Sequence, residues 1–228
     1  LPLQSPLLTG GDDREDRKGG QLLHALHGAR SEGCGGLWVI KKIFRVRDFL
    51  RSANQLADDS ILVFVDAFDV LCIRNDLDQL TADFIATGQD LIVGAETIFC
   101  HHRSETLPFF LENYLDRQAR YLNSGFIIAY KWAYLRMLDH ITDHFVEEYM
   151  LRHNHDDQRA LSTFMLKNSS LGLIKMELDS TQKFCHTHTY ADNPLCLDKI
   201  NSYFVHVTWL ALEIQANAYL QIKEHFHV

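Results

Sequence analysis

Short runs of hydrophobic residues that end in acidic side chains are the dominant pattern of this chain. The clearest run, Ile61–Leu71, reads ILVFVDAFDVL and is rich in β-branched and aromatic residues. A run of this kind, too short to span a membrane, predicts a buried strand of a parallel sheet. Its carboxyl end carries Asp66 and Asp69, and open α/β sheets bind their ligands at that edge. The pattern therefore predicts a ligand site at the end of this strand.

A second run of the same type, residues 90–96, ends in Glu96, and residues 75–87 between the two runs have helical spacing. Two successive units of strand, acid and helix predict an α/β fold with a parallel, doubly wound sheet. A polar turn is predicted at residues 123–125. The other predicted strands are 126–130, 171–178 and 202–207, the other predicted helices are 22–30 (weak spacing), 37–53, 107–115, 132–151, 156–167 and 209 onward, and residues 179–194 are predicted to be a loop.

The chain is predicted to form one domain after a flexible beginning. Residues 1–21 are rich in Pro, Gly and charged side chains, a composition that buries little apolar surface. We therefore assign residues 1–30 to a flexible N-terminal segment. Residues 31–228 have no internal repeat or low-complexity tract, and they predict a single α/β domain.

Composition narrows the classes of partner. The chain carries 30 acidic residues against 22 Lys and Arg, a formal net charge of −8. Nucleic acids and anionic membranes are bound through clustered positive charge, so neither is expected as a partner. No stretch approaches the roughly 20 apolar residues of a transmembrane helix.

The cysteines and one sequon bear on the cellular compartment. The five cysteines include no C-x-x-C pair, which argues against a zinc ribbon or a dense disulfide framework. A bridge between Cys100 and Cys185 would be consistent with an oxidising compartment. Asn168-Ser-Ser170 fits the N-glycosylation pattern, which is also common by chance.

A glycine-rich segment, Gly33-Cys-Gly-Gly36, precedes the predicted helix 37–53, whose early part carries Lys41 and Lys42. Free backbone N–H groups at the start of a helix are a ready anion site. A plain turn followed by a surface helix with exposed lysines explains the same residues. The histidines of His186-x-His188 lie in the predicted loop, where exposed side chains are favoured over a second metal site.

A divalent metal would explain the most distinctive polar residues. Asp66 and Asp69 are two residues apart, and a bending loop could aim both at one point, where a cation would relieve their repulsion. With His206 at the end of the last predicted strand, they make a sensible ligand set for Mn²⁺. The alternative is that Asp66 caps a turn and Asp69 is solvated. Asp156 and Asp157 head a predicted helix and are candidates for a general base or for stabilising charge on a sugar ring.

The chain resembles the glycosyltransferase domain of the procollagen lysyl hydroxylases and related collagen-type glycosyltransferases. Each motif is weak singly, but together they occur in the right order and spacing over residues from about 33 to 210. The motifs are Asp59–Leu71, Gly94–Glu96 with Cys100, Arg120–Phe126, Asp156–Gln158 and Val205–His206.

The resemblance implies a GT-A fold, a Rossmann-like mixed sheet flanked by helices, with bound Mn²⁺ and a UDP-sugar donor, UDP-galactose or UDP-glucose. Asp66, Asp69 and His206 match its metal ligands, and Asp156 and Asp157 match the catalytic acids near the transferred sugar. The matching donor-binding residues are Phe68 (against the uracil, where the family commonly has tyrosine), Glu96, Asn123, Ser124, Gln158, Gly35, Gly36 and Lys41.

The expected activity is transfer of a hexose to an acceptor hydroxyl of a protein or glycan, such as hydroxylysine of a collagen-like protein. The expected location is the secretory pathway, the ER or Golgi lumen. The chain departs from the family pattern in two places. After the metal-binding histidine the family often has Asn-Gly, whereas this chain has Val207-Thr208. In addition, no strand is evident before the glycine-rich loop. The domain therefore lacks its first strand or builds that edge differently. The alternatives are an inactive GT-A-like binding module and a metal-dependent phosphohydrolase.

Overall fold

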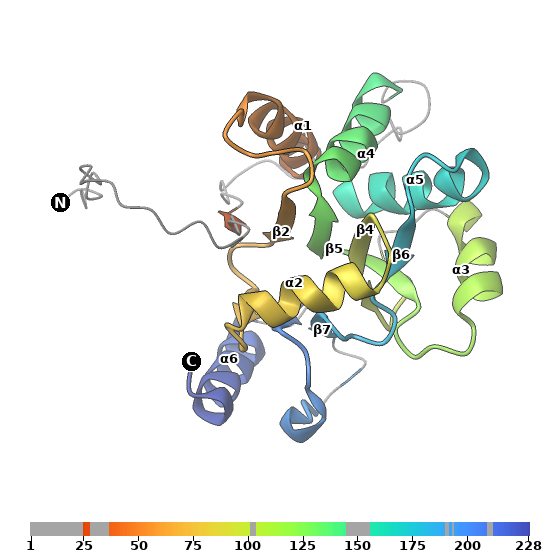
Figure 1. The fold of residues 1–228 in the computed structure, drawn as a ribbon. Helices are drawn as coiled ribbons and strands as arrows, with labels where there is room; N and C mark the ends of the chain where they lie inside the picture. The colour runs from red at the N-terminus through yellow and green to blue at the C-terminus, as the bar shows by residue number, and fades with distance from the viewer. Residues whose placement is uncertain are drawn as a thin grey trace, which may run out of the picture.

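Two β-sheets form the centre of the protein (Figure 1). The computed structural model describes residues 25–27, 37–100, 104–144, 156–189, 192, 194–208 and 212–228. The larger sheet has the order β1-β2-β5-β4-β6. Its strands are β1 (Ala25–His27), β2 (Ile61–Val65), β4 (Leu91–Glu96), β5 (Tyr121–Tyr130) and β6 (Met176–Leu178).

Strand β5 gives this sheet its mixed character. It pairs antiparallel with both β2 and β4, whereas β1 pairs parallel with β2 and β6 pairs parallel with β4. The predicted α/β class with a mixed sheet flanked by helices is confirmed. The wholly parallel sheet expected from the strand and helix units is wrong, because an apolar run carries no information about strand direction.

The smaller sheet has the order β3-β8-β7, with strands β3 (Val70–Cys72), β8 (Phe204–Val207) and β7 (Cys185–His188). The run predicted as one strand over 61–71 is therefore divided between two sheets: β2 ends at Val65 and β3 begins at Val70. The predicted loop over 179–194 contains β7. This strand is held by parallel pairing with β8, and such a long-range contact cannot be predicted from the sequence of β7 alone.

Helices cover the free faces of the sheets. The core on one face of the larger sheet includes Leu62 and Phe64 of β2, and that on the other face includes Ile61 and Val63. The first core is closed by α1 (Leu37–Ser52), α3 (Leu107–Tyr114), α4 (Lys131–Asp143) and α5 (Asp157–Leu171), the second by α2 (Leu77–Ala86) and the smaller sheet (Figure 1). Helix α6 (Leu212–Phe226) packs Ala218 and Ile222 against the outside of the smaller sheet.

The N-terminal edge of the larger sheet corrects two expectations. Residues 25–27 form β1, where weak periodicity predicted a helix over 22–30. Because β1 pairs in register with β2, from Ala25 opposite Val63 to His27 opposite Val65, the sheet does have a strand preceding β2. It lies within the segment predicted to be flexible. The domain boundary near residue 30 otherwise stays a prediction.

Helix α5 is longer than predicted, and the side chain of the sequon residue Asn168 has a structural role at its end. It continues to Leu171 and is terminated by Gly172 at φ 62°, which leaves only residues 176–178 for the predicted strand 171–178. Asn168 is buried, with its Oδ1 accepting hydrogen bonds from the backbone N–H groups of Leu173 and Ile174 and its amide donating to the Ile174 carbonyl. The Asn168 side chain is therefore part of the helix terminus.

The predicted Cys100–Cys185 bridge is wrong, because Cys185 is a free thiol. It is fully buried at the start of β7 and belongs to the core between the two sheets. Burial raises the pKa of this thiol, so Cys185 is a small apolar core residue rather than a reactive one.

Candidate metal and donor site

The loop from Asp66 to Asp69 joins the two sheets and is fixed at both ends. The backbone N–H of Asp66 donates to the carbonyl of Gly125 in β5, at 2.9 Å. The backbone N–H of Val207 in β8 donates to the carbonyl of Asp69, at 2.8 Å. The two carboxylates therefore lie on a short crossover. Its first residue, Asp66, is hydrogen-bonded to the larger sheet, and its last residue, Asp69, is hydrogen-bonded to the smaller sheet.

This crossover brings Asp66 and Asp69 to His206. One ligand atom of each residue lies within 4.8 Å of the other two, and His206 Nε2 is 3.5 Å from Asp69 Oδ2. His206 is 3% exposed, and its Nδ1 has no hydrogen-bond partner among the described residues. Two carboxylate oxygens and an imidazole nitrogen are a donor set that suits Mn²⁺, so the residues present fit such an ion.

Gly125 leaves the space that the His206 ring occupies. A Cβ atom at this position would lie 2.1 Å from His206 Cε1 and 2.6 Å from Nδ1, so no other residue fits without moving the imidazole. The turn predicted at 123–125 is wrong: these residues lie inside β5, beside a register shift of β4 between Val93 and Gly94. The Asn123 side chain accepts a hydrogen bond from the Gly125 N–H, at 2.9 Å, and supports this irregularity.

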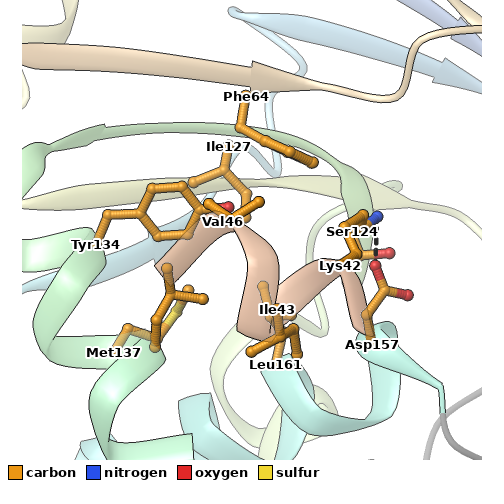
Figure 2. Close-up of a pocket in the computed structure, with 11 residues that line it drawn as sticks. Lys42, Ile43, Val46, Phe64, Ser124, Ile127, Tyr134, Met137, Asp157 and Leu161 are labelled. Atoms are coloured by element: carbon orange, nitrogen blue, oxygen red, sulfur yellow. Dashed lines mark ion pairs between the residues drawn. The ribbon is translucent and has the colours of Figure 1, made fainter. Parts of the chain in front are cut away.

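Lys42 of α1 connects the metal candidate to the acids of α5. Its Nζ lies 2.9 Å from Asp66 Oδ1 and also forms an ion pair with Asp157 (Figure 2). Burial alone would lower the pKa of Lys42, but the charges of Asp157 and Asp66 outweigh burial and raise it. The sequence predicts Lys41 as the donor-site residue, but Lys42 makes these contacts. Adjacent residues of a helix point about 100° apart, so only one of the two can face the site.

A cavity of about 10 Å³ lies beside the Lys42–Asp157 pair and is lined by residues of α1, α4 and α5 and of strands β2 and β5 (Figure 2). Figure 2 shows Tyr134 and Met137 of α4 on one side and Leu161 of α5 on another. This volume is close to the minimum that holds one water molecule. The Lys42 side chain thus borders a packed region whose other lining residues are mostly apolar.

A buried polar network lies at the end of β4. Glu96 is fully buried and accepts hydrogen bonds from the amide of Asn123, at 3.0 Å, and the amide of Gln158, at 2.7 Å. Gln158 Oε1 in turn accepts from the backbone N–H of Ser124, at 3.2 Å. Burial raises the pKa of Glu96 to about 8, although both amide bonds act to lower it. The carboxyl is therefore mostly protonated at neutral pH.

Four predicted donor-binding residues thus form one support. Glu96, Asn123, Ser124 and Gln158 are buried and bonded to one another between β4, β5 and the start of α5. They fix the position of the first turn of α5. Direct contact between any of them and a donor stays a prediction.

The two acids at the start of α5 have different surroundings. Asp156 is the N-cap and accepts a hydrogen bond from the Gln158 N–H, at 2.8 Å. Its charge acts on Glu96 and contributes to the raised pKa there. Asp157 is 3% exposed and is paired with Lys42. One acid therefore faces the Glu96 network and the other faces the metal candidate.

The remaining predicted residues lie at the margin. Phe68, between the two metal-ligand candidates, is 62% exposed, and its carbonyl accepts a hydrogen bond from the Tyr219 hydroxyl of α6. Its ring is therefore available to a flat ligand. Gly35 and Gly36 lie outside the described residues. Thr208 is buried, and its N–H donates to the His188 carbonyl, which continues the β7–β8 pairing one residue past Val207, the end of β8.

Comparison with known proteins decides the family. The model of the PLOD GT domain family matches residues 20–211, most of the chain. The chain belongs to the PLOD GT domain family. Among solved structures, mouse xyloside xylosyltransferase 1 is similar, with a TM-score of 0.46 and 14% sequence identity. The match covers 78% of this chain and 67% of that chain. A glycosyltransferase involved in glycosylation of the major capsid of the virus PBCV-1 is similar with a TM-score of 0.45, 10% identity, 82% and 74% covered. No curated protein matched the sequence.

As a PLOD GT domain, the chain is a glycosyltransferase with the α/β fold of the GT-A type, as the sequence motifs predicted. A glycosyltransferase implies a sugar donor and an acceptor, and the domain covers the Asp66–Asp69 crossover, both sheets and the start of α5. Among the described residues, no helix is long and apolar enough to cross a bilayer.

Proposed function

We propose that this PLOD GT domain transfers a hexose from a UDP-sugar, UDP-galactose or UDP-glucose, to an acceptor hydroxyl in a reaction that depends on Mn²⁺. The acceptor we favour is a hydroxylysine of a collagen-like protein in the secretory pathway. The observation that carries the proposal is the convergence of Asp66, Asp69 and His206, whose ligand atoms lie within 4.8 Å of one another. A bound divalent ion supplies Lewis-acid stabilisation of the charge on a departing diphosphate.

The chain's own residues would divide the remaining work. The exposed ring of Phe68 offers a stacking surface for a uracil. Lys42, held between Asp66 and Asp157, provides a fixed positive charge beside the metal candidate, where diphosphate oxygens would gather. Its raised pKa keeps it protonated throughout the physiological range.

The acid that acts on the acceptor would come from the start of α5. Glu96 is a poor base at neutral pH, because its pKa of about 8 leaves it mostly protonated. Asp156 is partly exposed, whereas Asp157 is buried and paired with Lys42, so Asp156 is the more accessible of the two acids to receive an acceptor proton or to stabilise charge on the sugar ring.

The test is UDP release from UDP-galactose and UDP-glucose, with and without a hydroxylysine-containing peptide, in Mn²⁺ and after chelation. We expect release that needs Mn²⁺ and is lost in Asp66→Asn. Absence of release with both donors contradicts the proposal. Thermal stabilisation by UDP plus Mn²⁺ without turnover would instead identify a binding module, and phosphate release from a simple phosphate ester without UDP binding would identify a phosphohydrolase.

A further inference from the structure

Helix α6 carries two polar side chains that reach the chain segments around the metal candidate. Gln215 and Tyr219 are four residues apart, so they lie on the same face of the helix. The amide of Gln215 donates a hydrogen bond to the carbonyl of Val207, at 2.8 Å, and the hydroxyl of Tyr219 donates one to the carbonyl of Phe68, also at 2.8 Å. One turn of α6 therefore contacts both segments that supply the metal-ligand candidates.

The bond from Tyr219 holds the middle of the crossover between the two sheets. The ends of the crossover are fixed by backbone hydrogen bonds at Asp66 and Asp69. Among the residues that the structure describes, the Tyr219 bond is the one hydrogen bond that reaches Ala67 or Phe68 between them. The Phe68 ring is 62% exposed, so packing does little to orient it. Because the rotamers open to a side chain depend on its backbone conformation, a bond to the Phe68 carbonyl limits where the ring can point.

The Tyr219 side chain is itself held in place. It is half-buried and packs against the core that includes Ala218 and Ile222 of the same helix. Burial raises the pKa of its hydroxyl, the charge of Asp69 raises it further, and hydrogen bonding by Gln215 acts to lower it. The hydroxyl therefore keeps its proton throughout the physiological range and stays a hydrogen-bond donor.

We propose that Tyr219 is a positioning residue, which orients the ring of Phe68 for stacking on the uracil of the donor through its bond to the Phe68 carbonyl. The inference rests on the UDP-sugar donor of the proposed function. Gln215 supports Tyr219 from the preceding turn of α6 and ties the helix to β8. Asp69 is held by a bond of its own, because its carbonyl accepts from the Val207 N–H. Tyr219 should therefore affect the contact with the base and leave Mn²⁺ binding in place.

The test compares the affinity for UDP, measured by calorimetry in saturating Mn²⁺, between the unmutated chain and Tyr219→Phe, which removes only the hydroxyl. We expect UDP binding about three- to tenfold weaker, the range that one hydrogen bond contributes, with Mn²⁺ affinity changed less than about twofold. In the Phe68→Ala background the same substitution should hardly change UDP affinity, because the ring that it positions is absent. Tyr203→Phe is the matched control, since it removes a hydroxyl that donates to Asp83 of α2, at 2.7 Å.

Unchanged UDP affinity in Tyr219→Phe overturns the proposal. An equal loss in the Phe68→Ala background or in Tyr203→Phe overturns it as well, because either result shows a general effect on the fold. Chymotrypsin cleavage of the peptide bond between Phe68 and Asp69 gives a readout that needs no donor. This cleavage should be faster in Tyr219→Phe than in the unmutated chain or in Tyr203→Phe. Failure of UDP to bind the unmutated chain contradicts the proposed donor and with it the uracil contact, whereas an unchanged cleavage rate contradicts the restraint by Tyr219.

Discussion

The imidazole of His206 lies against the backbone of Gly125, in the space that any other residue would fill with its Cβ atom. The same glycine accepts the hydrogen bond from the Asp66 N–H through its carbonyl oxygen. Gly125 therefore sets the position of one metal-ligand candidate through its backbone and of another through its missing side chain. A glycine inside a central strand, usually unfavourable, is explained by this close approach.

Replacement of Gly125 by alanine should abolish the metal site. The added Cβ would stand 2.1 Å from His206 Cε1, so the ring must move. We expect loss of Mn²⁺ binding and of UDP release, with a fall in unfolding free energy of about 1–3 kcal/mol from overpacking. Mn²⁺ binding is measured by calorimetry and stability by urea unfolding.

Ser124→Ala is the matched control, because it changes the neighbouring buried residue and leaves its backbone bond to Gln158 in place. It should bind Mn²⁺ normally. If Gly125→Ala bound Mn²⁺ as well as Ser124→Ala, the close approach would not matter for the site.

Replacement of Lys42 by methionine should make stability depend on divalent metal. Without its ammonium, Asp66 and Asp157 lose their shared partner. Removing one partner of a buried ion pair typically costs about 3–5 kcal/mol, and the 21% exposure of the Lys42 side chain reduces the expected loss to about 2 kcal/mol. Urea unfolding should show this loss in chelator and a partial recovery in Mn²⁺.

Lys41→Met provides the comparison, since Lys41 is the neighbouring residue of α1 and makes no ion pair with Asp66 or Asp157. Its unfolding free energy should fall less than that of Lys42→Met, and the loss should not be recovered in Mn²⁺. Equal effects of the two substitutions would show that the Lys42 ion pairs do not stabilise the site.

Local sequence patterns predicted the elements but not how they are arranged. The sequence predicts that Asp66, Asp69 and His206 act together, and the structure brings them together. The apolar run 61–71 predicts one strand, because apolar continuity does not show that the chain leaves one sheet at Val65 and joins another at Val70. Whether a metal binds there stays a prediction.

The errors concern features set by distant contacts. β7 is short and rich in polar side chains, and only its pairing with β8 makes it a strand. The Asn-Ser-Gly sequence is typical of turns, but pairing of Asn123 with Gly94 of β4 and the hydrogen bond from the Asp66 N–H to the Gly125 carbonyl keep it inside β5. Lys42 rather than Lys41 faces the acids because of the rotational phase of α1 against β2. A helical wheel anchored on the buried Ile43, Val46 and Leu50 could have indicated this phase.

Glu96 should make the protein less stable as pH rises. Its pKa is about 8 in the folded chain against 4.5 for the ordinary side chain, so folding takes up a proton between these values. The stabilisation is fully present below about pH 4.5 and is lost as pH rises through 8, by an amount on the order of a few kcal/mol. Urea unfolding at a series of pH values measures this slope.

Glu96→Gln removes the titrating group and should flatten the pH dependence. The new amide N–H₂ would also face the N–H₂ of Asn123 or Gln158. Neither of these side chains can turn over freely, because its oxygen accepts a hydrogen bond from a backbone N–H of β5. The unfolding free energy at pH 5 should therefore fall by about 1–3 kcal/mol. The exposed Glu112 of α3 gives the control, Glu112→Gln, with the slope of the unmutated chain. A slope unchanged in Glu96→Gln would assign the proton uptake to another group.

The sequon at Asn168 should remain unmodified in the folded protein. The Asn168 amide nitrogen donates to the Ile174 carbonyl and is buried, so a glycan on it would break the termination of α5. Asn168→Ala should lower the unfolding free energy by about 1–3 kcal/mol, because two backbone N–H groups lose their acceptor.

Ser170→Ala destroys the same sequon from an exposed position and should leave stability unchanged. Expression through the secretory pathway should give one electrophoretic mobility for the unmutated chain and for Ser170→Ala, before and after glycosidase treatment. A glycosidase-sensitive shift in the unmutated chain alone would show that the sequon is modified before α5 folds, and that its burial comes too late to protect it.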